Sequence, residues 1–254
     1  CIKNKGGGIV IIGATDTILE NNICEENELS GIYLGSVYFK TCTRNRCVNN
    51  KMNGMSFGLC YGTISENYCA NNNLSGMRIG GSSYSIFVNN TCIENANGIY
   101  IIESFHLQVA NNTCENNDYG IYLVQGSWYD TLANNTIVNS NYDGIYAMRS
   151  REGLIIHNRI ENSKGYGVYL EGRTNDSVIA YNSFINNNLD GISQGYDDGF
   201  GNTWYDKEAK RGNYWSDWAN NGSYTIDGRA EAEDRYPLDE NLERINIVSP
   251  YWAF

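Results

Sequence analysis

NNTCIENANGIYII at 89–102 and NNTCENNDYGIYLV at 111–124 share one order of Asn, Cys, Gly and alternating apolar residues. The unit recurs along most of the chain, at intervals of 22 to 24 residues. Its asparagine stands two positions before a Cys or another apolar residue, at Asn22, Asn45, Asn67, Asn90, Asn112, Asn135, Asn158 and Asn182. A glycine follows that position by six or seven residues, at Gly8, Gly31, Gly54, Gly76, Gly98, Gly120, Gly144, Gly167 and Gly191. Such a repeat predicts a solenoid of stacked coils.

After each glycine, apolar residues alternate with residues of other kinds. Ile99 and Ile101, for example, flank Tyr100. Because successive side chains of a strand point to opposite faces, we expect the apolar residues to point inward and the tyrosines to face solvent. A further apolar column precedes the asparagines, at Leu19, Cys42, Ile64, Phe87, Val109, Leu132, Ile155 and Ile179. A coil of three short strands buries such apolar residues only by stacking on the next coil.

The predicted fold is an all-β, single-stranded right-handed parallel β-helix of about nine coils over residues 1–196. An irregular, aromatic-rich C-terminal cap is expected over residues 197–254. A leucine-rich repeat has a similar period, but its L-x-x-L-x-L run is missing here. We expect stacked side-chain amides in the first asparagine column and in a second one. The second column comprises Asn4, Asn27, Asn50, Asn72, Asn95 and Asn117.

The net charge of the chain disfavours some classes of binding partner. Lys and Arg total 18 against 29 Asp and Glu, a formal net charge of -11. Such a field repels nucleic acids and anionic membrane surfaces, and no apolar run reaches the roughly 18 to 20 residues that a membrane span needs. We therefore expect no nucleic-acid partner, no membrane span and no cofactor. Because the repeat is already under way at Cys1, we also expect an uncapped first coil that allows end-to-end self-assembly.

The cysteines follow the repeat. Six of the eight stand in one inward column, in which later coils carry Ile or Phe instead, at Cys1, Cys24, Cys47, Cys69, Cys92 and Cys114. This replacement favours buried free thiols that serve as apolar filler. Disulfides are the first alternative, but the parallel Cβ vectors of stacked coils suit them poorly. A thiolate ladder for Cu(I) or Zn is the second alternative.

Two motifs near the C-terminus, GNYWSDW at 212–218 and DRYPL at 234–238, lie outside the repeat. With the asparagine-rich coils, they resemble the C-terminal signature of NosD-like β-helix proteins, which are pectin-lyase-like and related to carbohydrate-binding and sugar-hydrolase modules. The resemblance implies an exported, extracellular or cell-surface protein, and the family name suggests copper handling. We expect Trp204, Tyr214, Trp215 and Trp218 to pack on the last coil, because solenoid ends need caps.

The outward tyrosines are the candidate carbohydrate-binding residues: Tyr33, Tyr100, Tyr122, Tyr146 and Tyr169. Rings aligned along one face would offer a flat amphipathic surface on which a sugar can lie. The alternative is cross-strand stacking that only stabilises the sheet.

Two sets of residues are candidates for catalysis. Asp143 and Asp190 each precede a coil glycine and would lie two coils apart, roughly 9 to 10 Å, which is near the upper limit for an inverting glycoside hydrolase. Arg149, Arg151 and Arg173 lie near Glu171 and suit a polysaccharide lyase, or else a surface ion-pair cluster. Both Asp residues are also ordinary turn residues.

Six N-x-S/T sequons predict glycosylation of an exported protein, at Asn73, Asn89, Asn111, Asn134, Asn175 and Asn221. The sequence thus favours an exported β-helix with a structural, assembly or carbohydrate-binding role and a carbohydrate or cell-envelope polymer as partner. A polysaccharide lyase or inverting glycoside hydrolase is the alternative, and a NosD-like copper-handling protein is the third interpretation.

Overall fold

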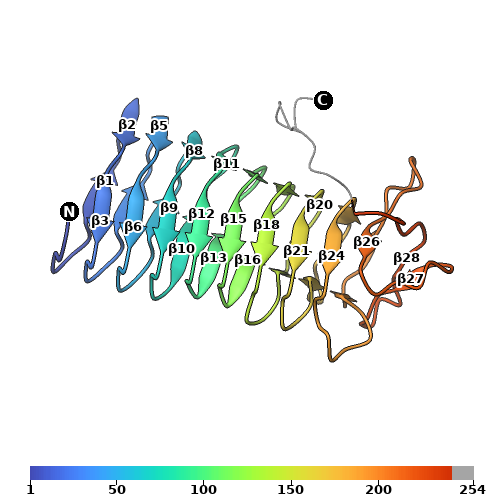
Figure 1. The fold of residues 1–254 in the computed structure, drawn as a ribbon. Helices are drawn as coiled ribbons and strands as arrows, with labels where there is room; N and C mark the ends of the chain where they lie inside the picture. Colours follow the sequence, from blue (N-terminus) through green and yellow to red (C-terminus); the bar gives the residue numbers. More distant parts are fainter. Residues whose placement is uncertain (242–254) are drawn as a thin grey trace.

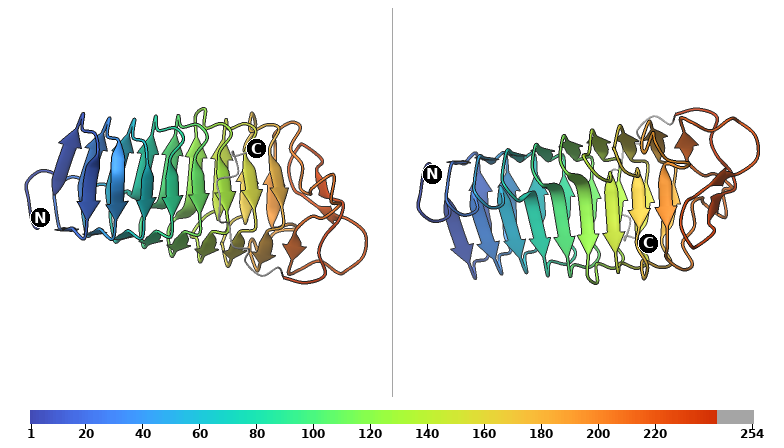
Figure 2. Two further views of the ribbon diagram at one scale, coloured as in Figure 1. Left: turned by 90° about the horizontal axis from the view of Figure 1, so that it is seen from above. Right: turned by 90° about the horizontal axis from the view of Figure 1, so that it is seen from below.

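The structure, a computed structural model, describes residues 1–241. Every regular element in this range is a β-strand, and the strands form a right-handed parallel β-helix (Figure 1). Three long parallel sheets run along the solenoid, and each coil contributes one strand to each sheet. Figure 2 shows the coils stacked side by side from the N-terminal end to the irregular C-terminal part. The predicted fold is confirmed.

The first sheet, here called sheet 1, has nine strands. They are β1 (Ile9–Ile12), β4 (Ile32–Gly35), β7 (Met55–Gly58), β10 (Ser75–Gly80), β13 (Asn97–Ile102), β16 (Tyr119–Val124), β19 (Ile145–Met148), β22 (Val168–Leu170) and β25 (Gly195–Asp197). Sheet 2 has eight strands. They are β2 (Thr17–Glu20), β5 (Phe39–Thr43), β8 (Thr63–Ser65), β11 (Ile86–Val88), β14 (Gln108–Ala110), β17 (Thr131–Ala133), β20 (Leu154–Ile156) and β23 (Val178–Ala180).

Sheet 3 again has nine strands. They are β3 (Ile23–Glu25), β6 (Arg46–Val48), β9 (Tyr68–Ala70), β12 (Thr91–Ile93), β15 (Thr113–Glu115), β18 (Thr136–Val138), β21 (Arg159–Glu161), β24 (Ser183–Ile185) and β26 (Tyr214–Trp215). Strands β1 to β24 form eight complete coils. A short antiparallel pair in the C-terminal part joins β27 (Tyr224–Thr225) to β28 (Glu233–Asp234).

The register places equivalent residues of consecutive coils directly beside one another. Cys24 pairs with Cys47, and Ile99 pairs with Ile121. The apolar column before the asparagines also pairs in sequence, as Phe87 with Val109. These side chains form one continuous buried core. The predicted columns are therefore true neighbours in space.

Both asparagine columns form hydrogen-bonded ladders. In the first, Oδ1 of Asn135 accepts from the backbone N of Asn112 at 2.9 Å and from its Nδ2 at 3.1 Å. Nδ2 of Asn135 in turn donates to the carbonyl of Val109 at 2.8 Å and to Oδ1 of Asn158 at 3.0 Å. The ladder thus satisfies backbone groups at a bend where the strand pairing is interrupted.

The frequent Asn-Asn doublets have a physical reason. In each of the doublets Asn89-Asn90 and Asn111-Asn112, the first residue has φ near +55° and the second belongs to the ladder. Asn adopts left-handed backbone conformations more readily than most residues. The first Asn of each doublet therefore forms a left-handed turn, and the second forms the ladder hydrogen bonds.

The glycine column exists because coils approach closely. A Cβ on Gly98 would lie 2.5 Å from the carbonyl oxygen of Gly120 and 2.8 Å from Sγ of Cys114. Neither atom can move away without disturbing the stack, so a larger residue does not fit. The regular spacing of glycine along the repeat therefore reflects crowding between coils.

All eight cysteines lie within the described residues and are free. Seven are buried, and Cys1 is exposed. Cys69, Cys92 and Cys114 stack in one inward column that Ile137 continues. Burial and hydrogen bonds between neighbouring thiols raise the pKa of Cys69 and Cys114 well above that of a free thiol. The column from Cys24 to Cys114 is the apolar filler that the sequence predicted, but the prediction is wrong for Cys1, which is exposed because no coil of the described residues lies on its outer side.

The last coil departs from the predicted register. The repeat placed Gly191 in the glycine column and Ile192 inward, but Ile192 is 88% exposed. Gly195 pairs with Val168 instead, and the amide of Gly167 donates to the carbonyl of Gln194. The segment between Asn187 and Gln194 is a bulge outside the sheet. The prediction is wrong here because the added residues form a loop rather than a longer strand.

The C-terminal part covers the last coil. β26 pairs with β24, and the Trp215 ring stacks on Phe184 with centroids 4.2 Å apart. Trp204 is also buried in the core cluster, and Trp218 packs partly against it. Tyr214 is half-buried because it alternates with Trp215 and points away from the core. β25 itself spans the expected boundary between residues 196 and 197.

Asp130 carries a buried carboxyl group whose ionised form is disfavoured in the folded protein. Its Oδ1 accepts from the backbone N of Leu107 at 2.8 Å, while Oδ2 is buried without a hydrogen-bond partner. Burial raises the pKa of Asp130 well above its ordinary value. The fold therefore favours the protonated carboxyl. Its contribution to the free energy of unfolding is fully present below the unfolded pKa of about 4 and is lost as the pH rises through the folded pKa.

Asp130→Asn is therefore expected to stabilise the protein at pH 7. The amide cannot ionise, so the gain is roughly 1 to 3 kcal/mol, the usual cost of a buried unsatisfied polar group. Urea unfolding measured at pH 7 and at about pH 4 checks this. The advantage over the wild type should disappear at the lower pH, and an equal gain at both pH values would contradict the assignment.

Candidate functional site

The solvent-facing column of sheet 1 brings most of the predicted tyrosines together. The register runs through nine consecutive strands, as Val10, Tyr33, Ser56, Arg78, Tyr100, Tyr122, Tyr146, Tyr169 and Tyr196. The last five residues form an uninterrupted tyrosine ladder. Tyr33 is not part of this ladder, because Ser56 and Arg78 separate it from Tyr100.

The rings of the ladder stack face to face. Tyr146 and Tyr169 have centroids 5.2 Å apart at an interplanar angle of 12°, and Tyr169 and Tyr196 are 4.3 Å apart at 9°. The ring faces are therefore covered by neighbouring rings, and the ladder presents its edges and hydroxyl groups. The expected flat platform is absent there, because a coil spacing of about 4.8 Å is close to the distance at which aromatic rings stack.

Tyrosine hydroxyls and carboxylates form a polar row along this face. The Tyr146 hydroxyl donates to Oε2 of Glu171 at 2.5 Å, and the Tyr166 hydroxyl donates to Oδ2 of Asp227 at 3.2 Å. Burial and the negative charge of Asp227 raise the pKa of Tyr166 to about 12. These hydroxyls stay protonated at neutral pH and can exchange hydrogen bonds with the hydroxyl groups of a sugar.

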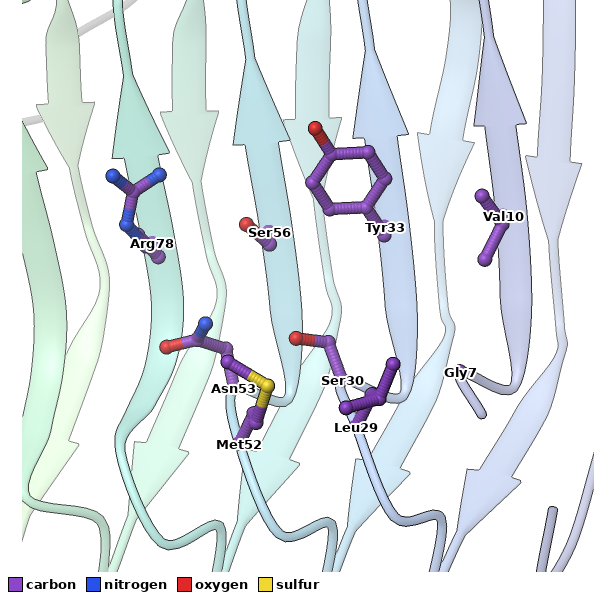
Figure 3. Close-up of a pocket in the computed structure, with 9 residues that line it drawn as sticks. All are labelled: Gly7, Val10, Leu29, Ser30, Tyr33, Met52, Asn53, Ser56 and Arg78. Atoms are coloured by element: carbon purple, nitrogen blue, oxygen red, sulfur yellow. The ribbon is translucent and has the colours of Figure 1, made fainter. Parts of the chain in front are cut away.

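Next to the ladder, the small side chain of Ser56 leaves a hollow of about 410 Å³. Tyr33 and Arg78 lie on its two sides, one coil away from Ser56 in each direction. Figure 3 shows the Tyr33 ring with its face turned to the viewer, over strands of sheet 1. The remaining lining is apolar and amide or hydroxyl in character, from Gly7, Val10, Leu29, Ser30, Met52 and Asn53.

The hollow combines one aromatic ring, one guanidinium and an otherwise mostly apolar lining. Tyr33 is 41% exposed and stacks on no other aromatic ring of the described residues, so its ring face is open to a ligand. Arg78 forms no ion pair within the described residues, and its guanidinium can donate to sugar hydroxyls or a carboxylate. Few polar groups in an apolar concave surface are typical of ligand sites.

The two predicted catalytic carboxylates are not brought together. Asp143 is nearly buried beside the tyrosine face, where Oδ1 accepts from the backbone N of Tyr166 at 2.8 Å. Burial raises the pKa of Asp143 to about 6. Asp190 is exposed on the bulge, and Gln194 occupies the register position that it was expected to hold. The predicted inverting pair is therefore wrong.

The three candidate arginines do meet. Arg149, Arg151 and Arg173 line a hollow of about 520 Å³ together with Trp128 and Gln125. None of the three forms an ion pair in the described part of the chain. The expected ion-pair cluster with Glu171 is therefore wrong, and that carboxylate accepts a hydrogen bond from the Tyr146 hydroxyl.

The sequence matches the family described as periplasmic copper-binding protein (NosD) over residues 1–104 and 61–220. The chain belongs to this family. A comparison with curated proteins gave no match.

The fold of this NosD family member is similar to that of alginate-modifying enzymes. The A-module of mannuronan C-5 epimerase AlgE6 from Azotobacter vinelandii superposes with a TM-score of 0.58 at 14% identity, over 89% of this chain and 62% of that one. The A-module of AlgE4 from the same organism gives a TM-score of 0.48 at 14% identity, over 72% and 59%. The chain thus spans about 60% of the length of these structures.

The copper in the NosD family description has no matching set of ligands in the described residues. Residues 1–241 hold no group of three or more His, Cys, Asp or Glu side chains placed to share a metal ion. Seven of the eight thiols that could bind Cu(I) are buried, and neighbouring thiols of the buried column hydrogen-bond one another. The side chains present do not fit a copper site of that composition.

The predicted glycosylation sites of this NosD family member differ in solvent exposure. Asn73, Asn89 and Asn221 are exposed, and Asn111 and Asn175 are half-buried. Asn134 is fully buried within the coils, so the folded chain has no room for a glycan there and this part of the prediction is wrong. Across the described residues, the fold has no helix with the length and apolarity for a membrane crossing.

The sequence pattern missed two features of the surface. Tyr196 belongs to the ladder, but the bulge before it hid its register. Trp128 stands in a column of the turn between sheets 1 and 2, between Phe105 and Arg151. This column has no fixed residue type, so only the spacing of 23 residues could have found it.

Proposed function

We propose that this protein is an exported glycan-binding β-helix that holds an extended polysaccharide along the outer face of sheet 1. The observation that supports this most is the hollow between Tyr33 and Arg78, in line with the hydroxyl row of the tyrosine ladder. From Tyr33 to Tyr196 the register makes seven coil steps, about 34 Å at 4.8 Å per step. A surface of this length suits a polymer better than a single sugar.

The two parts of the face contribute differently. The free ring of Tyr33 would stack on one sugar unit, while the ladder offers hydrogen bonds to later units of the same chain. The stacked ladder is rigid before the ligand arrives, so little side-chain entropy is lost on binding. An exported location is supported by the description of the NosD family as periplasmic, and the sequence led us to expect an extracellular or cell-surface protein.

Tyr33→Ala is expected to weaken polysaccharide binding by about tenfold or more, since a stacked ring contributes more than 1 kcal/mol. Isothermal titration against a panel of neutral and acidic polysaccharides measures the effect. Tyr61→Ala is the matched control, because Tyr61 is an exposed ring in the turn between sheets 1 and 2 and does not line the hollow. Equal affinities of the two variants would contradict the proposed site. Long oligosaccharides should also bind more tightly than disaccharides.

A polysaccharide-cleaving enzyme is the second candidate. The observation in its favour is Asp143, whose raised pKa of about 6 and position beside the tyrosine face suit a general acid. A binding protein leaves its ligand intact, so reducing-end and unsaturated-uronate assays should stay blank. Turnover that disappears in Asp143→Asn would favour the enzyme instead.

A further inference from the structure

The hollow around Trp128 carries an unusual concentration of positive charge. Arg149 and Arg151 come from the turn after β19, and Arg173 comes from the turn after β22 in the next coil. The guanidinium of Arg151 lies 5.9 Å from the centroid of the Trp128 ring, which holds it over the hollow. Gln125 adds an amide that can donate or accept.

Within residues 1–241, no acidic side chain forms an ion pair with these arginines. Glu171 accepts the hydroxyl of Tyr146 at 2.5 Å. Glu152 hydrogen-bonds with the Tyr129 hydroxyl and raises the pKa of that phenol. In a chain with a net charge of -11, three guanidinium groups with no ion-pair partner among the described residues line one hollow despite their mutual repulsion.

Repulsion of this kind disappears when an anion binds between the groups. Arginine donates two parallel N–H bonds to a carboxylate or sulfate, a geometry that lysine cannot reproduce. The hollow of about 520 Å³ has room for such a group and part of a sugar ring. The walls therefore supply both the charge and the space for an anionic substituent.

We propose that this hollow binds the carboxylate or sulfate groups of an acidic polysaccharide, which rests on the proposed glycan-binding function and specifies its substrate class. Arg149 follows Tyr146 by three residues, and Gln125 follows Tyr122 by three, about 10 Å along the strands. A branch or a neighbouring chain of a glycan bound on the tyrosine face reaches the arginines. The tyrosine face binds the sugar rings, and the arginines select their charge.

The test compares Arg149→Gln/Arg173→Gln with the wild type. The control is Arg44→Gln/Arg46→Gln, which removes the same charge from arginines paired with Glu66 and Glu25. The probes are polygalacturonate, its methyl ester, dextran sulfate, dextran and inorganic phosphate, titrated calorimetrically at constant ionic strength. The expected result is a roughly 10- to 100-fold loss of affinity for an acidic polymer in the hollow variant alone.

Each outcome has a defined meaning. Neutral polymers bound equally well by the wild type and the hollow variant, together with a loss for acidic ones, support the inference. Acidic polymers bound equally by both variants overturn it and leave the proposed function intact. Binding of phosphate alone, without polymers, overturns it in favour of a free anion. If no polymer binds the wild type, the proposed function itself is wrong.

Discussion

Asn135→Leu is expected to cost roughly 3 to 6 kcal/mol of unfolding free energy, the largest loss for any single substitution in the coils. The change preserves side-chain volume but removes four hydrogen bonds, two accepted from Asn112 and two donated to Val109 and Asn158. These partners are buried, so the backbone N of Asn112 loses its acceptor and the carbonyl of Val109 loses the Asn135 donor without replacement by water.

Denaturant unfolding followed by circular dichroism measures this loss. Asn73→Leu is the control, because Asn73 is exposed and lies outside both ladders. Its effect should stay within about 0.5 kcal/mol, as for most surface substitutions. If both variants unfolded at the same denaturant concentration, the ladders would not be a source of the stability of the fold.

Asp234→Ala is expected to release the cap and to cost roughly 3 to 5 kcal/mol, because buried donors lose their acceptor. Oδ2 of Asp234 accepts from the backbone N of Asn213 at 2.7 Å and from Nε1 of Trp215 at 2.9 Å. Oδ1 accepts from the backbone N of Tyr236 at 3.0 Å. Asn213 is itself the last rung of the first ladder, because its Oδ1 accepts from Asn182.

Loss of the cap has its own signature. Trp204 and Trp215 would reach water, so tryptophan fluorescence should shift to longer wavelength before the coils unfold. Limited proteolysis should cut the C-terminal part first. Asp239→Ala, which removes an exposed carboxylate nearby, is the matched control. An unshifted emission maximum in Asp234→Ala would contradict the role assigned to this carboxylate.

The two C-terminal motifs gain a common explanation from this network. GNYWSDW supplies Asn213 and Trp215, and DRYPL supplies Asp234. The motifs lie about twenty residues apart, yet one buried carboxylate joins them. The sequence predicted that both belong to a cap, but it did not predict that they bond each other, because nothing in their spacing encodes the turn that brings Asp234 back to Asn213 and Trp215.

The columns of the coils were predictable for a simple reason. Where the repeat length stays between 22 and 24 residues, parallel pairing fixes every neighbour, and Cys92 with Cys114 or Asn90 with Asn112 follow directly. The rule broke at Gly191, where a loop was inserted and the repeat glycine no longer marked a strand. Periodicity identifies equivalent positions only while insertions are absent.

The surface was less predictable than the core. The sequence correctly placed the tyrosines outward, but ring orientation depends on neighbours in three dimensions. Consecutive tyrosines stack and cover their faces, whereas Tyr33, next to a small serine, leaves its face open. The sequence placed the arginines on neighbouring coils, but only the structure shows that they form no ion pair in the described part of the chain.

The most direct test of a glycan-binding sheet 1 is the chemical-shift change of backbone amides on titration with an acidic oligosaccharide. We expect the largest chemical-shift changes at Tyr33, Ser56 and Arg78, with further changes along the tyrosine ladder toward Arg149. Changes confined to sheet 3 or to the cap, with sheet 1 unaltered at saturation, would contradict it.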